Sequence, residues 1–335
     1  MNKNFFKNKK VLITGGTGSF GKTLVGHFLK NKFPLKKLVI ISRDELKQNE
    51  MSQVFSVNKF PNLRYFLGDI RDKDRLKFAV QDIDIVIHAA ALKQVPSSEY
   101  NPFEFIKTNI LGSENVIEAC INSNVSNVVA LSTDKASSPV NLYGATKLCS
   151  DKLFTSAQNI IGNRKLAFSV VRYGNVMFSR GSILPKLLNE KAHGYFSITD
   201  LGMTRFNITL NESVNFVLNC LLSQKGGEIF IPKIPSYRLS DICKAIDKNC
   251  KIKIIGVRQG EKMHEELISS FDAQNTLEFK SHYVILTNYE NQIKKILNKK
   301  GIKFVNKNFS YTSDANKEFL DVKTLKKLIS ENCNH

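Results

Sequence analysis

The sequence of 335 residues lacks several features that would mark other classes of protein. Its six cysteines, at positions 120, 149, 220, 243, 250 and 333, form no CxxC pair and no metal-ligand spacing, which favours reduced thiols and indicates no metal site. No apolar run is long enough to cross a bilayer, and the first residues have no signal-peptide core. We therefore expect a cytoplasmic protein without a metal and without a membrane partner.

Acidic residues are also scarce, because 30 aspartates and glutamates stand against 49 lysines and arginines, for a net charge of +19. Such a charge suits a nucleic acid or an anionic small substrate. The lysines are scattered among asparagines and are not gathered into one arm. We expect no nucleic-acid partner, and the charge alone carries little functional information.

The first half of the sequence contains a regular alternation of apolar strands and helical patterns. Continuous apolar runs, typical of buried parallel strands, lie at residues 11–14, 38–41, 63–67, 85–87, 128–131 and 168–173. Helical patterns lie between them at residues 20–30, 72–80, 103–123 and 143–159. This alternation predicts an α/β fold with a doubly wound parallel sheet of the Rossmann type.

A glycine-rich loop follows the first strand directly. Gly16, Gly18 and Gly21 satisfy the pattern GxGxxG, and Gly15, Gly18 and Gly21 satisfy GxxGxxG. Glycine lets the backbone approach a pyrophosphate, whose charge is then held by the N–H groups of the following helix. Because a strand precedes the loop and a helix follows it, the loop predicts dinucleotide binding rather than a structural turn.

The tip of the second strand indicates which dinucleotide binds. An NAD-selective site places a carboxylate there, on the ribose 2′-hydroxyl. This chain has Ser42 and Arg43 instead, a hydroxyl and a guanidinium that suit a 2′-phosphate. The sequence therefore favours NADP, although Asp44 and Glu45 follow closely and leave NAD open. Asp69, after the third strand, can reach the adenine amino group or can cap a turn.

The pattern becomes less regular after about residue 175. We expect residues 1–175 to form the NADP-binding domain, with a returning segment near residues 205–232. Residues 176–290 are expected to form a smaller, interleaved C-terminal substrate-binding lobe. Residues 291–335 are expected to form a basic helical tail.

Tyr143 and Lys147 lie four residues apart, and hence on one face of a helix that follows the fifth strand. An isolated pair of this kind is often a surface tyrosine over a lysine. Here, in a nucleotide-binding sheet, the lysine can hold the nicotinamide ribose and lower the pKa of the tyrosine. A phenolate can then take a hydroxyl proton during hydride transfer.

Asp134 and Lys135 add an acid and a base just upstream of that pair. A simple dehydrogenase needs only the tyrosine and the lysine, so the combination indicates elimination of water from an oxidised intermediate. An ordinary lysine, with a pKa of about 10.4, is a poor base. We expect burial, Lys147 and the nicotinamide to lower the pKa of Lys135. The alternative is that Asp134 caps a helix and Lys135 points to water.

These motifs resemble the extended short-chain dehydrogenase/reductase family, and within it the sugar-nucleotide dehydratases that act on UDP-N-acetylglucosamine with inversion at C5, the first step of pseudaminic acid synthesis. The resemblance covers residues from about 10 to 270. The matching segments are Thr14–Gly21, Ser42–Lys47, Glu99–Pro102, Ser132–Lys135, Asn141–Lys147, Arg172–Val176, Met203–Phe206, Gly226–Pro235 and Gly260–Glu265.

The resemblance implies a mechanism. Tyr143 would deprotonate the sugar 4-hydroxyl while hydride passes from C4 to NADP⁺, and Lys135 would remove the C5 proton. Asp134 would protonate the departing 6-hydroxyl before hydride returns to C6. Retaining relatives carry an acidic residue in place of Lys135, so reprotonation of C5 from the other face implies an L-arabino product. The resemblance also implies a homo-oligomer, a hexamer.

The motifs and the resemblance together give the expected site. The expected catalytic residues are Thr133, Asp134, Lys135, Tyr143 and Lys147. The expected substrate-binding residues are Lys93, Lys135, Asn175, Arg205, Arg258 and Glu261. The expected cofactor-binding residues are Gly15, Thr17, Gly18, Ser19, Phe20, Gly21, Ser42, Arg43, Asp44, Glu45, Leu46, Lys47, Asp69, Ile70, Ala89, Lys93, Asn109, Tyr143 and Lys147.

Four positions depart from the family pattern and leave the exact sugar open. Gln94 replaces a histidine, Met177 and Phe178 replace a Val-Gly pair, and Asn207 replaces a tryptophan, a residue type the chain lacks altogether. One alternative is a dehydratase or dehydratase/C5-epimerase acting on a related UDP-sugar. A second is a non-catalytic NADP-binding sensor, against which the acid–base residues argue.

Overall fold

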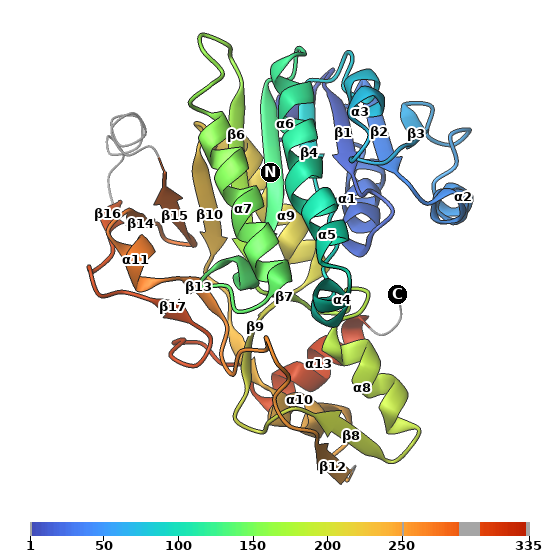
Figure 1. Cartoon of the computed structure of the whole chain (residues 1–335). Helices are drawn as coiled ribbons and strands as arrows, with labels where there is room; N and C mark the ends of the chain where they lie inside the picture. Colours follow the sequence, from blue (N-terminus) through green and yellow to red (C-terminus); the bar gives the residue numbers. More distant parts are fainter. Residues whose placement is uncertain (1, 250, 288–301, 333–335) are drawn as a thin grey trace.

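The centre of the protein is a ten-stranded sheet (Figure 1). The computed structural model describes residues 2–249, 251–287 and 302–332. The strand order is β16-β14-β15-β10-β6-β5-β4-β1-β2-β3. Its parallel strands are β1 (Lys10–Thr14), β2 (Lys37–Ser42), β3 (Leu63–Leu67), β4 (Ile85–His88), β5 (Asn127–Thr133), β6 (Ala167–Tyr173) and β10 (Glu228–Pro232).

All six strands predicted from the apolar runs are present. The order 3-2-1-4-5-6 is that of a doubly wound dinucleotide-binding fold, so the predicted fold class is confirmed. The strands at the centre of the sheet are mainly apolar because helices cover both faces, and every side chain of β4 is buried.

Two groups of helices cover the sheet (Figure 1). On one face α1 (Ser19–Lys30) packs against α9 (Leu210–Ser223). On the other, α6 (Gly112–Ile121) lies between α3 (Lys73–Ala79) and α7 (Leu142–Ala157). The helix α2 (Glu45–Val54) follows β2. The α9–β10 segment therefore packs against the central sheet, with α9 on α1 and β10 beside β6.

The helix predicted over residues 103–123 is interrupted. It consists of α5 (Pro102–Phe105), a π-helical turn at Ile106–Leu111, and α6. Within the turn, the Asn109 side chain accepts a hydrogen bond from the Leu92 N–H and donates one to the Leu92 carbonyl, both 2.9 Å long. This tertiary clasp on a loop residue far away in sequence gives a physical reason for the local change of period.

A second lobe lies below the carboxyl ends of the parallel strands in Figure 1. It has its own apolar core, in which Leu184, Phe196 and Ile242 are fully enclosed. It contains α8 (Ile183–Lys191), β8 (Tyr195–Ile198), α10 (Leu239–Ile246), β12 (Lys251–Ile254) and α13 (Val322–Asn332). Short strands connect the two parts: β7 (Asn175–Val176), β9 (Thr204–Ile208), β11 (Ser236–Arg238), β13 (Glu266–Ile268) and β17 (Tyr311–Thr312).

The C-terminal half is more interleaved than the expected boundaries. The strands β14 (Thr276–Glu278), β15 (His282–Leu286) and β16 (Lys303–Phe304) extend the central sheet in antiparallel fashion. Of the expected helical tail, residues 291–301 and 333–335 lie outside the described residues. The remainder forms β16, β17 and α13, and the apolar stripe of α13, with Leu325 and Ile329, packs into the lobe core.

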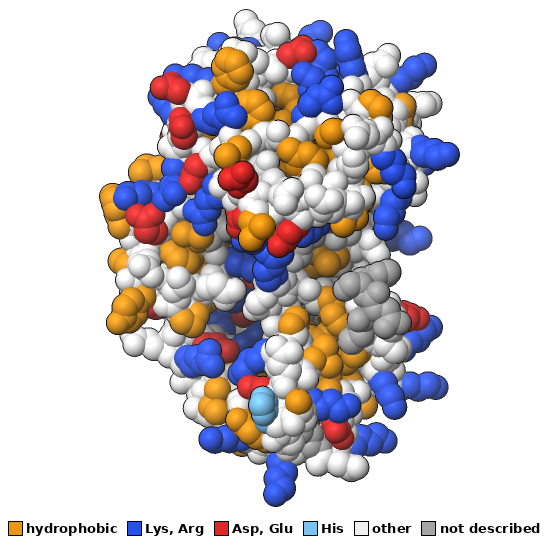
Figure 2. Space-filling model, turned by 90° about the vertical axis from the view of Figure 1, so that its right-hand side faces the viewer, with side chains coloured by type: hydrophobic (Ala, Val, Ile, Leu, Met, Phe, Trp, Pro, Cys, Tyr) orange, Lys and Arg blue, Asp and Glu red, His pale blue; other side chains and the backbone are white. Residues whose placement is uncertain are grey.

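The surface carries lysine and arginine on all sides of the view in Figure 2, without one dominant patch. This distribution agrees with the scattered charge pattern of the sequence. Within residues 2–249, 251–287 and 302–332, no helix is long and apolar enough to span a membrane.

Candidate active site

Two cavities lie at the carboxyl ends of the parallel strands, where open α/β sheets bind their ligands. One, of about 290 Å³, is lined by Gly15, Thr17, Gly18, Ile41–Asp44, Lys47, Gly68–Ile70, Ala89–Ala91, Thr108 and Arg180. The other, of about 300 Å³, is lined by Val95, Pro96, Glu99, Lys135, Asn141, Asn175, Ile183, Arg205, Leu239, Arg258–Lys262 and Glu265. We call them the cofactor pocket and the substrate cleft.

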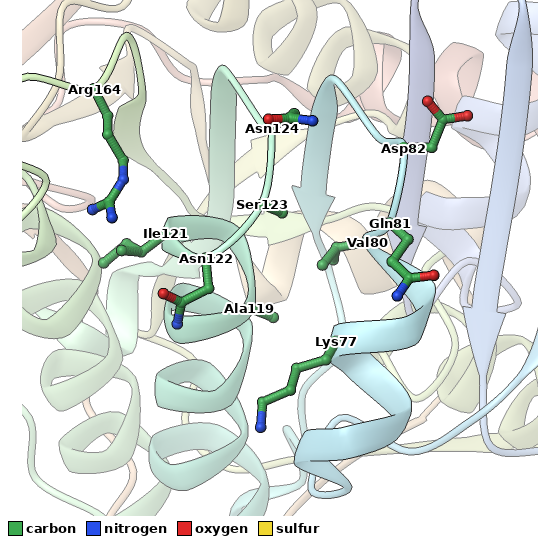
Figure 3. Close-up of a pocket in the computed structure, with 10 residues that line it drawn as sticks. All are labelled: Lys77, Val80, Gln81, Asp82, Ala119, Ile121, Asn122, Ser123, Asn124 and Arg164. Atoms are coloured by element: carbon green, nitrogen blue, oxygen red, sulfur yellow. The ribbon is translucent and has the colours of Figure 1, made fainter.

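A larger hollow of about 570 Å³ opens at the opposite edge of the sheet (Figure 3). It lies between the end of α3, the end of α6 and Arg164, with Lys77 and Asp82 on its rim. None of the predicted site residues lines it. Its position at the amino ends of the strands makes it the wrong edge for a nucleotide.

The glycine loop brings backbone to the floor of the cofactor pocket. Gly15 has a φ of 66°, and a Cβ atom at this position would lie 2.8 Å from the Cα of Ala90. A side chain there would be strained by the backbone and would collide with the neighbouring strand end. The loop therefore leaves a cradle that only glycine can form, at the N-terminus of α1.

The tip of β2 presents a cation but no free carboxylate. Arg43 is exposed at the pocket, while Ser42 is buried and its hydroxyl accepts a hydrogen bond from Gln48. Asp44 caps α2, accepting a 3.0 Å hydrogen bond from the Lys47 N–H, and its other oxygen pairs with the Lys47 ammonium. Of the two carboxylates that left NAD open, Asp44 is thus engaged by its own helix, and Glu45 is exposed and lies outside the pocket lining.

Asp69 combines the two alternatives that the sequence left open. Its carboxylate lines the pocket, yet it also accepts hydrogen bonds from the backbone N–H and the guanidinium of Arg71, at 3.0 and 2.7 Å. It therefore caps a turn and still faces the nucleotide position.

The residues predicted to bind the cofactor fall into two groups, according to whether they line the pocket. Those that line the pocket are Gly15, Thr17, Gly18, Ser42, Arg43, Asp44, Lys47, Asp69, Ile70 and Ala89. Those that lie outside its lining are Ser19, Phe20, Gly21, Glu45, Leu46, Lys93, Asn109, Tyr143 and Lys147. Leu46 is 67 % exposed on α2, whereas Asn109 is buried in its clasp on Leu92.

The predicted acid–base residues come together where β5 ends and α7 begins. Thr133 is the last residue of β5 and caps the 3₁₀ turn Asp134–Ala136. The Asn141 side chain caps α7, so Tyr143 lies in its first turn. A Cβ atom at Gly144 would lie 2.3 Å from the Lys135 carbonyl oxygen. Glycine at this position therefore lets the helix touch the turn.

Asp134 is an enclosed carboxyl group. Its Oδ1 accepts hydrogen bonds of 3.0 Å from the Thr133 hydroxyl and from the Lys135 ammonium, and its Oδ2 has no partner among the described residues. Burial, followed by the charge of Glu265, raises its pKa above the ordinary aspartate value. An aspartate in this setting is suited to hold a proton and donate it.

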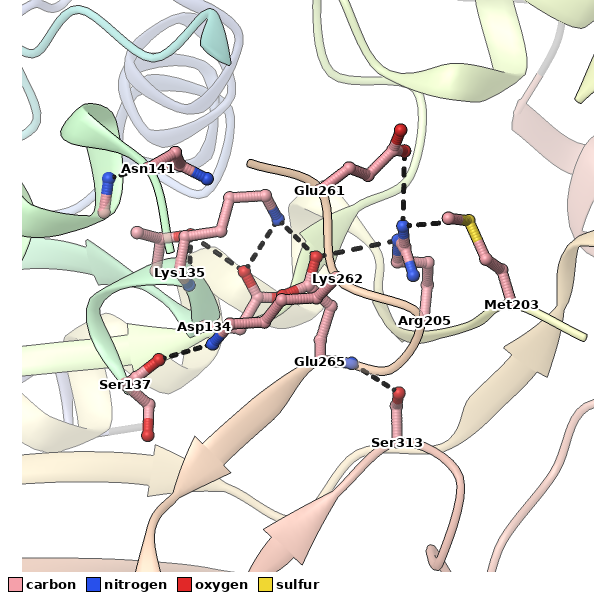
Figure 4. Close-up of polar contacts among 12 residues, drawn as sticks. Asp134, Lys135, Ser137, Asn141, Met203, Arg205, Glu261, Lys262, Glu265 and Ser313 are labelled. Atoms are coloured by element: carbon pink, nitrogen blue, oxygen red, sulfur yellow. Dashed lines mark hydrogen bonds and ion pairs between the residues drawn. The ribbon is translucent and has the colours of Figure 1, made fainter. Parts of the chain in front are cut away.

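Lys135 lies between two carboxylates (Figure 4). Its Nζ is 3.0 Å from Asp134 Oδ1 and 2.9 Å from Glu265 Oε1, with 25 % of the side chain exposed. Burial acts to lower its pKa, but the charges of Asp134 and Glu265 outweigh burial and raise the pKa above the usual lysine value. The predicted lowering is wrong, because the charge of the adjacent Asp134 was not weighed and the contact with Glu265 is a tertiary one.

Tyr143 and Lys147 are both buried, on one face of α7. Burial raises the pKa of Tyr143 to about 12, while the Lys135 charge and a hydrogen bond with Thr133 act in the opposite direction. The predicted lowering of the tyrosine pKa is therefore wrong for this arrangement. Lys147 donates a 2.7 Å hydrogen bond to the Leu131 carbonyl, and burial lowers its pKa.

The predicted substrate residues gather in the substrate cleft, with one exception. Asn175, Arg205, Arg258 and Glu261 line it together with Lys135. Lys93 lies outside this lining and its ammonium is 3.5 Å from the Ser179 hydroxyl. The cleft thus draws on the 3₁₀ turn after β5, on β7, on β9 and on the 258–265 segment, which are far apart in sequence.

Four charged residues that line the pocket or the cleft were not predicted, namely Glu99, Arg180, Lys262 and Glu265. Glu265 is buried and pairs with both Lys135 and Arg205, and Lys262 donates to the Ser137 carbonyl at 2.6 Å. Arg180 lines the cofactor pocket. Glu265 and Lys262 lie in a segment that matches the family, but spacing alone does not tell which of its side chains face inward.

One departure from the family pattern has a backbone consequence. Phe178, at the position where we expected glycine, has a φ of 62°, in the left-handed region that side chains rarely adopt. A glycine would adopt this backbone without strain, and the phenylalanine packs partly against the lobe core.

Comparisons with known proteins agree with this geometry. Residues 11–287 match the family model described as polysaccharide biosynthesis protein. The chain is 52 % identical over 333 residues to a UDP-N-acetylglucosamine 4,6-dehydratase (inverting) of Campylobacter jejuni, covering 97 % of this chain and 98 % of the relative. It is also 41 % identical over 288 residues to a UDP-glucose 4-epimerase of Rickettsia akari, covering 84 % and 83 % of the two chains.

A solved structure has the same fold over nearly its full length. The X-ray structure of Pen from Bacillus thuringiensis superposes with a TM-score of 0.89 at 38 % identity, covering 98 % of this chain and 99 % of that one. The family resemblance drawn from the motifs is confirmed by these matches.

Proposed function

The chain belongs to the polysaccharide biosynthesis protein family, within the extended short-chain dehydrogenases/reductases, and we propose that it catalyses the NADP-dependent 4,6-dehydration of UDP-N-acetylglucosamine with inversion at C5. The product would be UDP-2-acetamido-2,6-dideoxy-β-L-arabino-hex-4-ulose. The observation that carries the proposal is the enclosed Asp134–Lys135 pair beside Tyr143, because elimination of water needs an acid and a base that simple oxidation does not.

The cofactor pocket fits a dinucleotide. The cradle at Gly15 and the N-terminus of α1 suit a pyrophosphate, and the Thr108 hydroxyl is buried at the pocket without a partner among the described residues. When bound, the nicotinamide would accept hydride from C4 and return it to C6. Arg43, Lys47 and Arg180 support NADP, since three cations line the pocket and Asp44 is engaged by α2.

Tyr143 would take the proton of the 4-hydroxyl. Because burial raises the free energy of the phenolate, nearby cations are needed to stabilise it. Lys135 already acts to lower its pKa, and Lys147 lies one helical turn away on the same face. A bound cofactor adds positive charge to the same space.

Asp134 would donate the proton that leaves with the 6-hydroxyl. Thr133 links it to Tyr143: the Thr133 hydroxyl donates to Asp134 Oδ1 and hydrogen bonds with the Tyr143 phenol. The Thr133 side chain therefore links Tyr143, which would take the proton of the 4-hydroxyl, to Asp134, which would protonate the leaving 6-hydroxyl. This link is the catalytic role that we assign to Thr133.

Lys135 would remove the C5 proton, which the C4 ketone acidifies, and a proton returned to the other face of C5 would give inversion. Arg205 and Arg258 would bind the diphosphate, because a guanidinium can give two hydrogen bonds to phosphate oxygens. Asn175, with a buried Oδ1 that has no partner in the described part of the chain, would accept a hydrogen bond from the sugar. Glu261 orients Arg205 at 3.4 Å.

The test is incubation of the protein with NADP⁺ and UDP-N-acetylglucosamine in D₂O, followed by NMR. We expect a C6 methyl group, deuterium at C5 and inverted configuration at C5. A C6-methyl product with retained configuration at C5 would contradict the role of Lys135. A 4-epimer that keeps its 6-hydroxyl would assign the protein to the epimerase activity instead. Binding of NADP without turnover of any UDP-hexose would favour a sensor.

A further inference from the structure

Glu265 is a buried carboxylate for which the proposed mechanism has no role. It precedes β13, and its backbone is fixed on both sides by Ser313, with its N–H donating to Oγ at 2.9 Å and its carbonyl accepting from the Ser313 N–H at 2.8 Å. The side chain lines the substrate cleft and is 2 % exposed. A backbone held this firmly places the carboxylate at a defined point beside Lys135.

The two oxygens of Glu265 have different surroundings (Figure 4). Oε1 accepts a hydrogen bond from Lys135 Nζ at 2.9 Å and lies 3.6 Å from Arg205 Nε. Oε2 is buried and has no partner among the described residues. One carboxylate oxygen is therefore in contact with the ammonium while the other retains free acceptor capacity.

This arrangement addresses a difficulty in the proposed mechanism, on which the inference rests. Lys135 cannot take the C5 proton while it is an ammonium ion. We propose that Glu265 accepts the ammonium proton of Lys135, so that the two side chains act as one proton-sharing pair. Glu265 acts through Lys135 and is in that sense a positioning residue.

The step balances without any further reagent. An N–H bond of Lys135 breaks and an O–H bond forms on Glu265, so an ion pair becomes a neutral pair of the same total charge. The free amine then takes the C5 proton, and the C5–H electron pair passes to the C4 ketone as an enolate. The enolate expels the 6-hydroxyl, which leaves as water with the proton of Asp134.

Substrate binding favours this transfer. The sugar would cover the exposed quarter of Lys135, and removal of water destabilises an ion pair relative to its neutral form. The charge of Arg205 also stabilises Glu265 as a carboxylate, and a diphosphate bound to the guanidinium would weaken this stabilisation. The substrate would thus shift the proton at the moment when a base is needed.

The pH response of the pair depends on all the groups that face it. These groups are Asp134 on the 3₁₀ turn, Tyr143 on α7, Arg205 on β9, Tyr237 on β11, Lys93 after β4, and Lys262 in the same segment as Glu265. Two of these groups are buried carboxyl groups in contact with Lys135, namely Asp134 and Glu265. Asp134 must hold a proton to act as the acid, so Glu265 is the carboxylate left to accept the proton of Lys135.

The test compares Glu265→Gln with the wild type. The amide keeps an oxygen to accept from Lys135 but cannot take a proton. We expect reduction of the cofactor to continue, because Tyr143 and Lys147 perform it, while C5 deuteration and water loss fall about 10²-fold or more at neutral pH. The variant's elimination rate should rise with pH over a range where the wild-type rate is flat.

The matched control is Glu266→Gln, the neighbouring carboxylate, which bonds to the Ser137 and Ser138 hydroxyls at 2.9 and 2.6 Å and not to Lys135. It should keep the wild-type pH profile. Equal slowing of cofactor reduction and elimination in Glu265→Gln would reduce Glu265 to a structural role, as would an unchanged pH profile. The shorter carboxylate of Glu265→Asp should restore part of the rate.

A second readout does not depend on turnover. The pKa of Lys135 can be followed in protein labelled with carbon-13 at lysine Cε, with UDP bound. Loss of the Glu265 charge should move the Lys135 titration to lower pH, and an unmoved titration would overturn the pairing. If the wild type makes no dehydrated sugar while this shift is seen, the proposed function fails and the pairing of the two side chains stands.

Discussion

The cofactor pocket and the substrate cleft lie side by side at one edge of the sheet, yet they are built in opposite ways. The pocket is lined by glycine backbone and by charged side chains, of which Asp44 and Asp69 are paired with Lys47 and Arg71. Among the described residues only the Thr108 hydroxyl lines it buried and unpaired. The cleft wall holds buried charges, and Asn175, Glu261 and Glu265 each keep an oxygen there without a partner. Such atoms carry a desolvation cost that a ligand can relieve.

The contrast shows which part is preformed. A pocket of glycine backbone whose carboxylates are already paired can bind a dinucleotide with little rearrangement. A cleft with paired charges and unmatched oxygens must exchange contacts when the sugar enters. The predictions below test the difference between the two regions.

The largest effect is expected in the acid–base cluster, from Asp134→Asn. Asparagine keeps the shape but cannot donate a proton, so elimination should slow by about 10²–10⁴-fold, roughly 3–5 kcal/mol of barrier. Oxidation at C4 should continue, and reduced cofactor should accumulate, as measured by its near-ultraviolet absorbance. If oxidation slows as much as elimination, Asp134 acts on structure and not as the acid.

In the sheet that carries the cofactor pocket, a buried neutral histidine predicts that the folded protein loses stability at low pH. His88 ends β4, shares a 2.8 Å hydrogen bond with Thr14, and is 1 % exposed. Burial, aided by Lys147, lowers its pKa from 6.5 to about 3. Because the folded pKa is lowered, its stability contribution is present above pH 6.5 and is lost as pH falls. By pH 4 the free energy of unfolding should be lower by about 3 kcal/mol as a result.

The measurement is urea unfolding at pH 7 and pH 4, for the wild type and His88→Asn. The variant should lose less stability between the two pH values, because it lacks the titrating imidazole. An identical acid loss in both proteins would show that other groups dominate the acid response.

Arg43→Ala tests the cation at the tip of β2. Loss of a charge-assisted contact to a 2′-phosphate should weaken NADP binding by about 1.5–3 kcal/mol, or about 10- to 150-fold, with NAD binding little changed. Calorimetric titration with the two dinucleotides measures the ratio. Arg164→Ala, at the far hollow, is the control. Equal weakening of both dinucleotides would remove the basis for preferring NADP.

Gly15→Ala tests whether the pocket is preformed by backbone. Alanine at a φ of 66° is strained, and its Cβ would lie 2.8 Å from the Cα of Ala90. We therefore expect the free energy of unfolding to fall by about 1–3 kcal/mol and the cofactor to bind more weakly. Gly162→Ala separates the two effects, since Gly162 has a φ of 61° with nothing within 4 Å of a Cβ. Similar stability and similar cofactor affinity in the two variants would contradict the cradle.

Sequence reasoning was most successful where structure is local. The six strands were predicted because a continuous apolar run is a property of neighbouring residues. The helix over residues 103–123 was predicted without its π turn, because the Asn109–Leu92 clasp that accompanies the turn is a tertiary contact. The helical tail was predicted without β16 and β17, whose partners lie at Thr276–Glu278 and Glu266–Ile268.

The same distinction between neighbouring residues and tertiary contacts applies to the candidate site. The spacing of Tyr143 and Lys147, the glycine loop and the Asp134–Lys135 pair are written in consecutive residues, so their proximity followed from the chain itself. The charge state of Lys135 did not follow, because it depends on Glu265, 130 positions away in sequence, as well as on the adjacent Asp134.

By itself, the sequence determined the sheet, the cradle for a dinucleotide and the residue types that acid–base chemistry needs, because each depends on the order of nearby residues. Only the tertiary structure decided which charges face one another. It set Lys135 between two carboxylates and raised its pKa where burial alone would have lowered it, because electrostatic energy depends on distance in space and not along the chain.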